Sequence, residues 1–461
     1  MQWSSYTDGF FNVSAKNGFL PVKAPLRQLP ERYAVLQQLI NQLPVEISPG
    51  HGGLLAEKGA LTQELAALPN YNDAITAEED VFVLQALFRA YAFLTSGYTL
   101  VPAHWSFTAT GNYGKARTLL PKNIAQPFTQ VAKKLEVYPW IDYHYAYSLG
   151  NYYKIDPKGG FNWENLGMCV KFSGKDDERG FIMLHVDINQ HSPQLIDGIA
   201  QLTAAEHKEH QNKSLALIRE AITKMNERRK LMWGASRWKH YNDFRVFIMG
   251  IKGNEDLFGA GLVYEGVSEV PQQYRGQTGA QDNIIPTLDI LTGINNTYEE
   301  NELTAYLLDL RKYRPKCIQR FLADLKVTFQ DKSLLERITE INNTAGLHIL
   351  FDIIDEVYFF RNGHWQFVQK YIMHNTAYPK ATGGTPIVSW IPNQIKAVIR
   401  AMEAVVAQLP EQDATRATCV EKIRTYKTLL NKQLQALNIE GYKPEEIYQL
   451  NKKYNLLDAR D

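Results

Sequence analysis

One long stretch with a helical repeat of apolar residues, 347–375, constrains the fold more than any other part of this chain. Its apolar side chains recur every three or four residues, which puts them on one face of a helix: Ile353, Val357, Phe360, Phe367 and Tyr371. His364 lies on the same face, between Phe360 and Phe367. An imidazole on a buried face either coordinates a metal or is a hydrogen-bonded core residue. The stretch by itself leaves both interpretations open.

Two neighbours of His364 favour a bound ligand. Gly363 precedes it in mid-helix, where glycine costs about 1 kcal/mol relative to alanine, and a flat group packed against the backbone would explain the missing side chain. Arg361 lies one helical turn before His364, within reach of an acidic group on the same ligand. Because a flat, acidic ligand that carries iron is haem, the stretch yields the hypothesis of a haem site.

Composition excludes several other classes of function. The 461 residues include 50 Lys and Arg against 49 Asp and Glu, and this balance does not favour a nucleic-acid or anionic-membrane partner. No apolar run is long enough to span a membrane, and the N-terminus shows no basic region followed by an apolar run, as a signal peptide would, so we expect a cytoplasmic protein. The three cysteines are widely spaced and form no haem-attachment motif, so any haem would be held without covalent bonds.

Helical periodicity dominates the chain and strand signals are scarce, so we predict a mainly α fold. The segment 97–114 interrupts the periodicity and contains Pro102 and Gly111. We therefore predict a small N-terminal domain over 1–115, a large helical domain over 116–440 and a polar tail over 441–461.

Two conspicuous clusters have ordinary explanations as well as functional ones. The window 138–153 holds seven Tyr and Trp residues, which either line an aromatic pocket or belong to the core. His207 and His210 have a metal-ligand spacing, but they lie among charged residues on what we interpret as a solvated helix face.

Eight short motifs, in order, resemble those of the indoleamine 2,3-dioxygenases. These enzymes use haem to insert both oxygen atoms of O2 across the C2–C3 bond of the tryptophan indole. The resemblance covers roughly residues 115–395. The motifs occupy residues 120–125, 172–174, 244–245, 261–266, 274–281, 288–294, 360–364 and 382–385.

The resemblance implies a large all-helical haem-binding domain capped by a smaller N-terminal domain. It also implies roles for residues at the haem. His364 would be the proximal iron ligand, and Arg361 would pair with a haem propionate. Asp289 would position Arg361, and Thr278 would lie at the haem edge. The cofactor would be non-covalent haem b, active in its ferrous form, with O2 as co-substrate.

On the substrate side, the resemblance assigns the carboxylate of the amino acid to Arg245. Its apolar flanks agree, because a guanidinium buried there needs an anionic partner, although an internal salt bridge would also serve. Thr382, in the glycine-rich loop 381–386, would reach the same end of the substrate. Phe181 and Tyr241 would be aromatic residues of the pocket.

Two positions depart from the vertebrate pattern. His185 stands where those members have a small serine above the iron, and His240 stands where they have phenylalanine, which predicts a more polar pocket. Because the related tryptophan 2,3-dioxygenases use a distal histidine to accept the indole N–H, His185 is a candidate for that role. The alternative is a core histidine bonded to a backbone carbonyl.

We interpret the chain as an enzyme that acts on a small-molecule indole amino acid and needs no dedicated reductase for its cycle. Two alternatives remain. One is an enzyme of the same fold that monooxygenates a modified indole in secondary metabolism. The other is a non-catalytic protein that binds haem or O2.

Overall fold

The structure, a computed structural model, describes residues 1–373, 375, 382 and 387–435. The predicted tail 441–461 therefore lies outside the described residues. The fold is mainly α, as predicted. Its helices are α1 Ala34–Gln42, α2 Ala60–Leu65, α3 Asn72–Thr76, α4 Val81–Thr110, α5 Lys122–Lys134, α6 Asp176–Asn189, α7 Ser192–Thr203, α8 Lys208–Arg229, α9 Met232–Ala235, α10 Asn242–Arg245, α11 Glu255–Phe258, α12 Ile284–Leu291, α13 Glu302–Leu310, α14 Lys316–Thr328, α15 Leu334–Glu340, α16 Thr344–Val368, α17 Ile387–Gln408 and α18 Arg416–Gln435.

The strands in the described part of the chain are short and form three small sheets. Strand β3 pairs in parallel with β6, with Leu120 opposite Tyr264, and β6 pairs antiparallel with β7. The other two sheets are the antiparallel pairs β1–β2 and β4–β5. The strands are β1 Glu46–Ser48, β2 His51–Gly52, β3 Leu119–Leu120, β4 Tyr152–Lys154, β5 Leu166–Met168, β6 Leu262–Tyr264 and β7 Ser268–Gln272.

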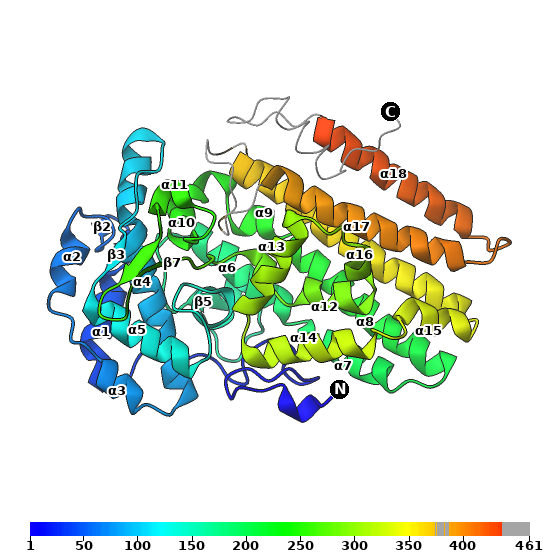
Figure 1. The fold of residues 1–461 in the computed structure, drawn as a ribbon, viewed down its shortest axis with the longest axis horizontal. Coiled ribbons are helices and arrows are strands. Elements are labelled where there is room, and N and C mark those ends of the chain that lie inside the picture. Colours follow the sequence, from blue (N-terminus) through cyan, green and yellow to red (C-terminus); the bar gives the residue numbers. More distant parts are fainter. Residues whose placement is uncertain (374, 376–381, 383–386, 436–461) are drawn as a thin grey trace.

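The stretch 347–375 forms the central helix, α16, which continues into one π-helical turn at Gln369–Met373. The Asn343 side chain caps its start by accepting a hydrogen bond from the backbone N–H of Gly346 at 3.0 Å. Ile353 and Val357 of the apolar face are fully buried, which stabilises the fold by about 1.5–3 kcal/mol for each side chain of this kind. Helix α16 packs against α8 and α17, and α18 covers α17 (Figure 1).

The prediction that the helical pattern breaks over 97–114 is wrong. Helix α4 runs without interruption to Thr110 and passes through both Gly97 and Pro102. A proline in a helix removes the N–H that would bond the carbonyl four residues earlier, here that of Tyr98. The guanidinium of Arg117 donates to this carbonyl instead, so the helix continues without an unsatisfied group.

The first residues of the chain, which include Tyr6 and Phe19, do not pack with the small N-terminal helices alone. Figure 1 shows α1–α5 gathered at one end of the molecule, whereas the first residues run along α14. The Tyr6 hydroxyl donates to Asp324 of α14 at 2.7 Å, and the Phe19 N–H donates to Ser192 of α7 at 2.9 Å. Helix α5 packs against α3 and α4. The division near residue 115 stays a prediction.

None of the described helices is long and apolar enough to cross a membrane.

Candidate active site

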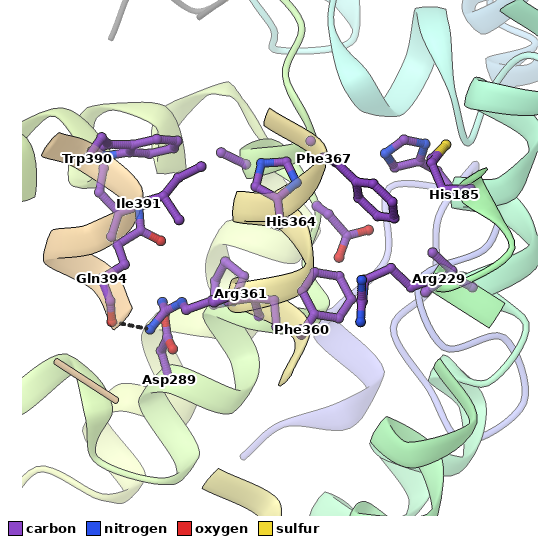
Figure 2. A pocket seen from close by; sticks show the side chains of 18 of the residues that line it. His185, Arg229, Asp289, Phe360, Arg361, His364, Phe367, Trp390, Ile391 and Gln394 are labelled. Carbon is purple, nitrogen blue, oxygen red and sulfur yellow. Dashed lines mark hydrogen bonds and ion pairs between the residues drawn. The ribbon is translucent and has the colours of Figure 1, made fainter. Parts of the chain in front are cut away.

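A large cavity lies beside α16 (Figure 2). It is bounded by α6, the end of α8, α12, α16 and α17, and its walls combine apolar side chains with a few charged ones. The residues that line it are His185, Ile188, Asn189, Arg229, Met232, Gly279, Ala280, Asp282, Ile285, Pro286, Asp289, Leu307, Arg311, Phe360, Arg361, His364, Phe367, Trp390, Ile391 and Gln394.

A second cavity adjoins the first. The two share His185 and His364 as lining residues, so both imidazoles lie where the cavities meet. The second cavity is the more aromatic one. It is lined by Phe181, His185, Met232, Tyr241, Ile248, Gln277, Thr278, Gly279, His364, Phe367, Val368, Tyr371, Ile372, Thr382, Trp390 and Ile391.

His364 presents its side chain to both cavities, while its neighbours Gly363 and Trp365 are buried. Burial away from bulk solvent, together with the positive charge of Arg229 and the proximity of His185, lowers the pKa of His364 to about 4. The imidazole is therefore neutral at physiological pH, which is the form that binds a metal. Among the described residues, no group of three or more His, Cys, Asp or Glu side chains could hold a metal ion.

Arg361 has protein partners for both of its terminal nitrogens. One nitrogen donates to Asp289 and to the Tyr298 hydroxyl, each at 2.7 Å, and the other donates to the carbonyl of Gln394 at 3.1 Å (Figure 2). Arg361 and Asp289 are 4% and 2% exposed, so this is a buried, hydrogen-bonded ion pair. Both residues line the large cavity, as expected, but the pair already neutralises much of the charge that a propionate would need.

Sequence reasoning missed Arg311, which also lines the large cavity. Two of its nitrogens, Nε and Nη2, are buried and have no hydrogen-bond partner among the described residues. The nearby Arg314 bonds the carbonyls of Ala280 and Asp282, so it does not compete for a ligand. Arg311 is therefore better placed than Arg361 to receive an acidic group. In the sequence, Arg311 and Lys312 simply follow a helix. Nothing there distinguishes Arg311 from an ordinary surface residue.

Gly363 is explained by a protein side chain. A Cβ at this position would lie 1.9 Å from Nη1 of Arg229, so the guanidinium occupies the space that any other residue would fill. The expectation that a flat ligand packs against Gly363 is therefore wrong: the flat group there is the guanidinium of Arg229, at the end of α8.

His185 lies on α6 and uses its two ring nitrogens differently. Nδ1 is 3.0 Å from the carbonyl of Phe181, so it carries the proton and donates to that carbonyl. Nε2 is left as an acceptor on the cavity side, 3.6 Å from where a Cβ on Gly279 would lie. Burial lowers the pKa of His185, opposed by the carboxylate of Asp282, so the ring is neutral.

The second cavity brings together Phe181, Tyr241 and Thr382, which were predicted for the substrate, and Thr278, which was predicted for the haem edge. The Phe181 and Tyr241 rings are 5.1 Å apart. The Thr382 hydroxyl donates to the carbonyl of Gln277 at 2.9 Å, and its carbonyl accepts from Gly250 at 2.8 Å. Of the predicted loop 381–386, Thr382 alone belongs to the described residues.

Arg245 is completely buried at the end of α10, in the wall behind Tyr241. It is not one of the described residues that line either cavity. Its charge lowers the pKa of Tyr113 and of Tyr241, although burial, the larger effect, raises both. The structure thus places Arg245 close to the aromatic pocket but behind its surface.

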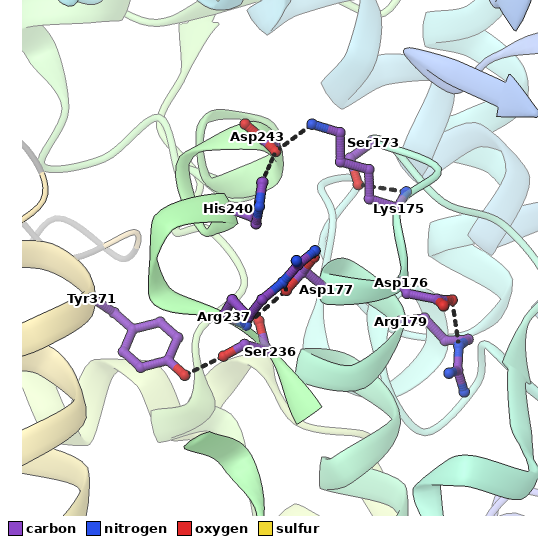
Figure 3. Close-up of polar contacts among 10 residues, drawn as sticks. All are labelled: Ser173, Lys175, Asp176, Asp177, Arg179, Ser236, Arg237, His240, Asp243 and Tyr371. Carbon is purple, nitrogen blue, oxygen red and sulfur yellow. Dashed lines mark hydrogen bonds and ion pairs between the residues drawn. The ribbon is translucent and has the colours of Figure 1, made fainter. Parts of the chain in front are cut away.

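His240 does not make the pocket more polar, contrary to expectation. Its Nδ1 lies 3.1 Å from Asp243, which also bonds Lys175 at 2.7 Å (Figure 3). Nearby, Arg237 and Asp177 form a two-point ion pair at 2.7 and 3.0 Å. These contacts fix the start of α6, which carries Phe181 and His185, to the segment that carries Tyr241.

The aromatic window 138–153 supplies core. The rings of Tyr143, Tyr145 and Tyr147 are almost completely buried in a π-helical turn, Tyr143–Tyr147, and none of them lines either cavity. His207 and His210 are exposed, as predicted for a solvated face.

Comparison with known proteins identifies the family. A family model described as Indoleamine 2,3-dioxygenase matches residues 8–432. The chain belongs to the indoleamine 2,3-dioxygenase family. It is 29% identical over 308 residues to Indoleamine 2,3-dioxygenase 1 of Rattus norvegicus, which covers 66% of this chain and 70% of the relative.

Two further relatives carry other names. A protein of Fusarium equiseti named 6-hydroxytryptophan 2,3-dioxygenase is 26% identical over 327 residues, covering 68% of this chain and 72% of the relative. A protein of Haliotis madaka named Myoglobin is 24% identical over 375 residues, covering 79% and 88%. Family membership therefore makes this chain a relative of dioxygenases without fixing its substrate.

Proposed function

We propose that this chain is a haem-dependent dioxygenase that adds both atoms of O2 across the C2–C3 bond of the indole of tryptophan or a tryptophan derivative. The product would be of the N-formylkynurenine type. The observation that carries the proposal is the neutral imidazole of His364, which faces two adjoining cavities from a helix that buries Ile353 and Val357 in the core. Membership of the family supports an indole as the substrate.

The large cavity fits the requirements of haem. It has apolar walls, two neutral imidazoles, His185 and His364, and a half-buried cation, Arg311, whose Nε and Nη2 are buried without a hydrogen-bond partner among the described residues. His364 would bind the iron of haem b, and Arg311 would receive an acidic group, with Arg361 and Asp289 beside it and Thr278 at the edge. None of the cysteines lines either cavity, which supports non-covalent binding. Bound haem supplies the ferrous iron that activates O2.

The second cavity would hold the substrate. Phe181 and Tyr241 provide aromatic walls for an indole, which aromatic stacking and burial both favour. Nε2 of His185 would accept the indole N–H. Thr382, and Arg245 from behind the aromatic wall, would recognise the amino-acid end, where a guanidinium gives a charge-assisted bond to a carboxylate.

The protein residues would bind, orient and shield the reactants. Buried aromatic walls hold the indole in one orientation and exclude water from the reaction. The overall reaction consumes no electrons, so no dedicated reductase is needed for the cycle. The partner of the enzyme is then a small molecule, not a nucleic acid, and we propose that it acts in the cytoplasm.

A second candidate function is O2 binding without turnover. It is favoured by one specific observation: a relative that spans most of this chain is named Myoglobin. The relative named 6-hydroxytryptophan 2,3-dioxygenase favours a modified indole as the substrate instead. Monooxygenation of such an indole is a third possible outcome of the same chemistry.

One experiment separates these functions. The purified, haem-loaded protein is reduced without O2, mixed with L-tryptophan or 6-hydroxytryptophan, and exposed to isotopically labelled O2. A product that gains two labelled oxygen atoms supports the dioxygenase. A gain of one atom indicates a monooxygenase, and reversible O2 binding with neither substrate consumed indicates an O2-binding protein.

A further inference from the structure

Arg229 is a buried cation at the end of α8 whose guanidinium contacts α16. Its Nε donates to Asn226 at 3.1 Å, and Nη2 donates to the carbonyl of Phe359 at 3.3 Å. The guanidinium also lies 5.8 Å from the ring of Phe360 and 5.7 Å from that of Phe367. Figure 2 shows the guanidinium beside Phe360, and Phe360 lies on the same helix as His364. These contacts hold the charge in one place.

Gly363 lets this charge come close to His364. A Cβ on Gly363 would lie 1.9 Å from Nη1, 2.3 Å from Cζ and 2.5 Å from Nη2 of Arg229. All three distances are far shorter than van der Waals contact, so the guanidinium lies directly on the backbone of the residue before His364. Glycine in mid-helix costs about 1 kcal/mol relative to alanine. Glycine at position 363 is therefore unfavourable for the helix, but it leaves room for the guanidinium of Arg229.

No carboxylate among the described residues forms an ion pair with Arg229. The nearest acidic group that affects it, Glu356, is bound instead by Asn226 at 2.7 Å and by Thr223 at 2.8 Å. Burial lowers the pKa of Arg229 to about 10, so it keeps its charge at neutral pH. A buried charge without an ion-pair partner is unfavourable for folding, and an apolar side chain of similar size would serve packing better.

A general structural role does not explain this placement. A cation near the end of α8 would favour the helix dipole, but the adjacent Arg228 already provides one and pairs with Asp187 at 2.6 Å. Arg228 is also partly exposed, so its charge carries a smaller desolvation cost. Arg229 differs in lining the large cavity and in facing the helix of His364.

We infer that Arg229 is a positioning residue that places a fixed positive charge beside His364 and thereby favours the ferrous form of the iron bound there. This inference rests on the proposed function, since it requires haem on His364. A nearby positive charge destabilises ferric iron more than ferrous iron, because the ferric form carries one more positive charge. The effect is strong in a buried site, where the effective dielectric constant is far below that of water.

The test is a potentiometric titration of the holoprotein with four variants. Arg229→Gln should lower the ferrous-to-ferric ratio at a fixed potential by about tenfold, which is about 59 mV for one electron. Arg229→Lys keeps the charge and should stay within about twofold of the parent ratio, because the Coulomb interaction survives. Lys230→Gln is the matched control: it removes the same charge from an exposed neighbour and should leave the potential unchanged.

Gly363→Ala keeps the test valid if Arg229→Gln does not fold. It leaves the net charge unaltered but forces the guanidinium away from the backbone, so the potential should fall in the same direction as in Arg229→Gln. An unchanged potential in Arg229→Gln or Gly363→Ala protein with parental haem content would overturn the inference. Haem loss in Arg229→Gln but not in Arg229→Lys would also overturn it, because Arg229 would then hold an acidic group of the ligand.

Haem content keeps the two proposals distinguishable. The comparison of the parent with His364→Ala tests the proposed haem site alone. The potentials of the Arg229 variants, measured on protein with parental haem content, test the inference alone. A parent protein that binds no haem would overturn both.

Discussion

The contact between Arg229 and Gly363 predicts that the two residues are strongly coupled in stability. The perturbation is Gly363→Ala, made in the parent and in an Arg229→Ala background. In mid-helix this change normally stabilises a protein by about 1 kcal/mol. In the parent, however, the new Cβ would meet Nη1 of Arg229 at 1.9 Å, so the guanidinium has to move.

The cost of that movement follows from the bonds that would break. The guanidinium donates to Asn226 at 3.1 Å and to the Phe359 carbonyl at 3.3 Å. A hydrogen bond to a charged group contributes about 1.5–3 kcal/mol, and the displaced guanidinium regains part of this by hydrogen-bonding to water. We expect a loss of about 1.5–3 kcal/mol in all, against the gain of about 1 kcal/mol from alanine. Gly363→Ala should therefore destabilise the parent by about 0.5–2 kcal/mol but stabilise the Arg229→Ala protein by about 1 kcal/mol.

The measurement is urea unfolding of the haem-free proteins, with the coupling free energy taken from the complete double-mutant cycle. Gly234→Ala is the control substitution, because a Cβ there would meet nothing within 4 Å. Its effect should add to that of Arg229→Ala within about 0.5 kcal/mol. A coupling for Gly363 as small as that of the control would show that the guanidinium does not occupy this space.

Four further predictions concern the site. His364→Ala should purify folded but with little haem, which the Soret band and haem content will show; a normal band would refute its role as the iron ligand. Arg311→Gln should weaken haem binding about tenfold or more, measured by transfer of haem to an acceptor protein, since a buried charge-assisted bond is worth about 1.5–3 kcal/mol; unchanged affinity would leave the acidic group to Arg361. Arg245→Ala should raise the Kd of tryptophan about ten- to a hundredfold but leave tryptamine nearly unaffected, and equal losses for both would make Arg245 structural. His185→Ser should cost about three- to tenfold in kcat/KM for tryptophan and improve the relative use of 1-methyltryptophan; an unchanged ratio of the two substrates would show that His185 does not touch the indole nitrogen.

The parts of the fold that follow from local periodicity could be predicted from the sequence. The apolar face of α16 and the position of His364 on it depend only on residues a few places apart. The continuation of helix α4 through Pro102 could not be predicted. The hydrogen bond to the Tyr98 carbonyl comes from the guanidinium of Arg117, which lies beyond the end of the helix.

In the candidate site, too, contacts between residues that are distant in the sequence could not be predicted. Gly363 was recognised as unusual, but the reason for it lies on another helix, at Arg229. The role of Arg311 depends on which of several neighbouring arginines is left with unsatisfied nitrogens after folding, and a sequence does not state this. The resemblance places His240 in the pocket by its match to a family position, whereas its contact with Asp243 holds it outside.

His185 shows why a structural and a functional interpretation of one residue need not compete. The bond from Nδ1 to the Phe181 carbonyl is the contact expected of a core histidine. The same bond fixes the proton on Nδ1 and leaves Nε2 as an acceptor at the junction of the two cavities. A ring without that backbone bond could carry its proton on either nitrogen, and in one of these forms it would present a donor to the indole N–H. The structural contact thus selects the tautomer that the proposed role requires.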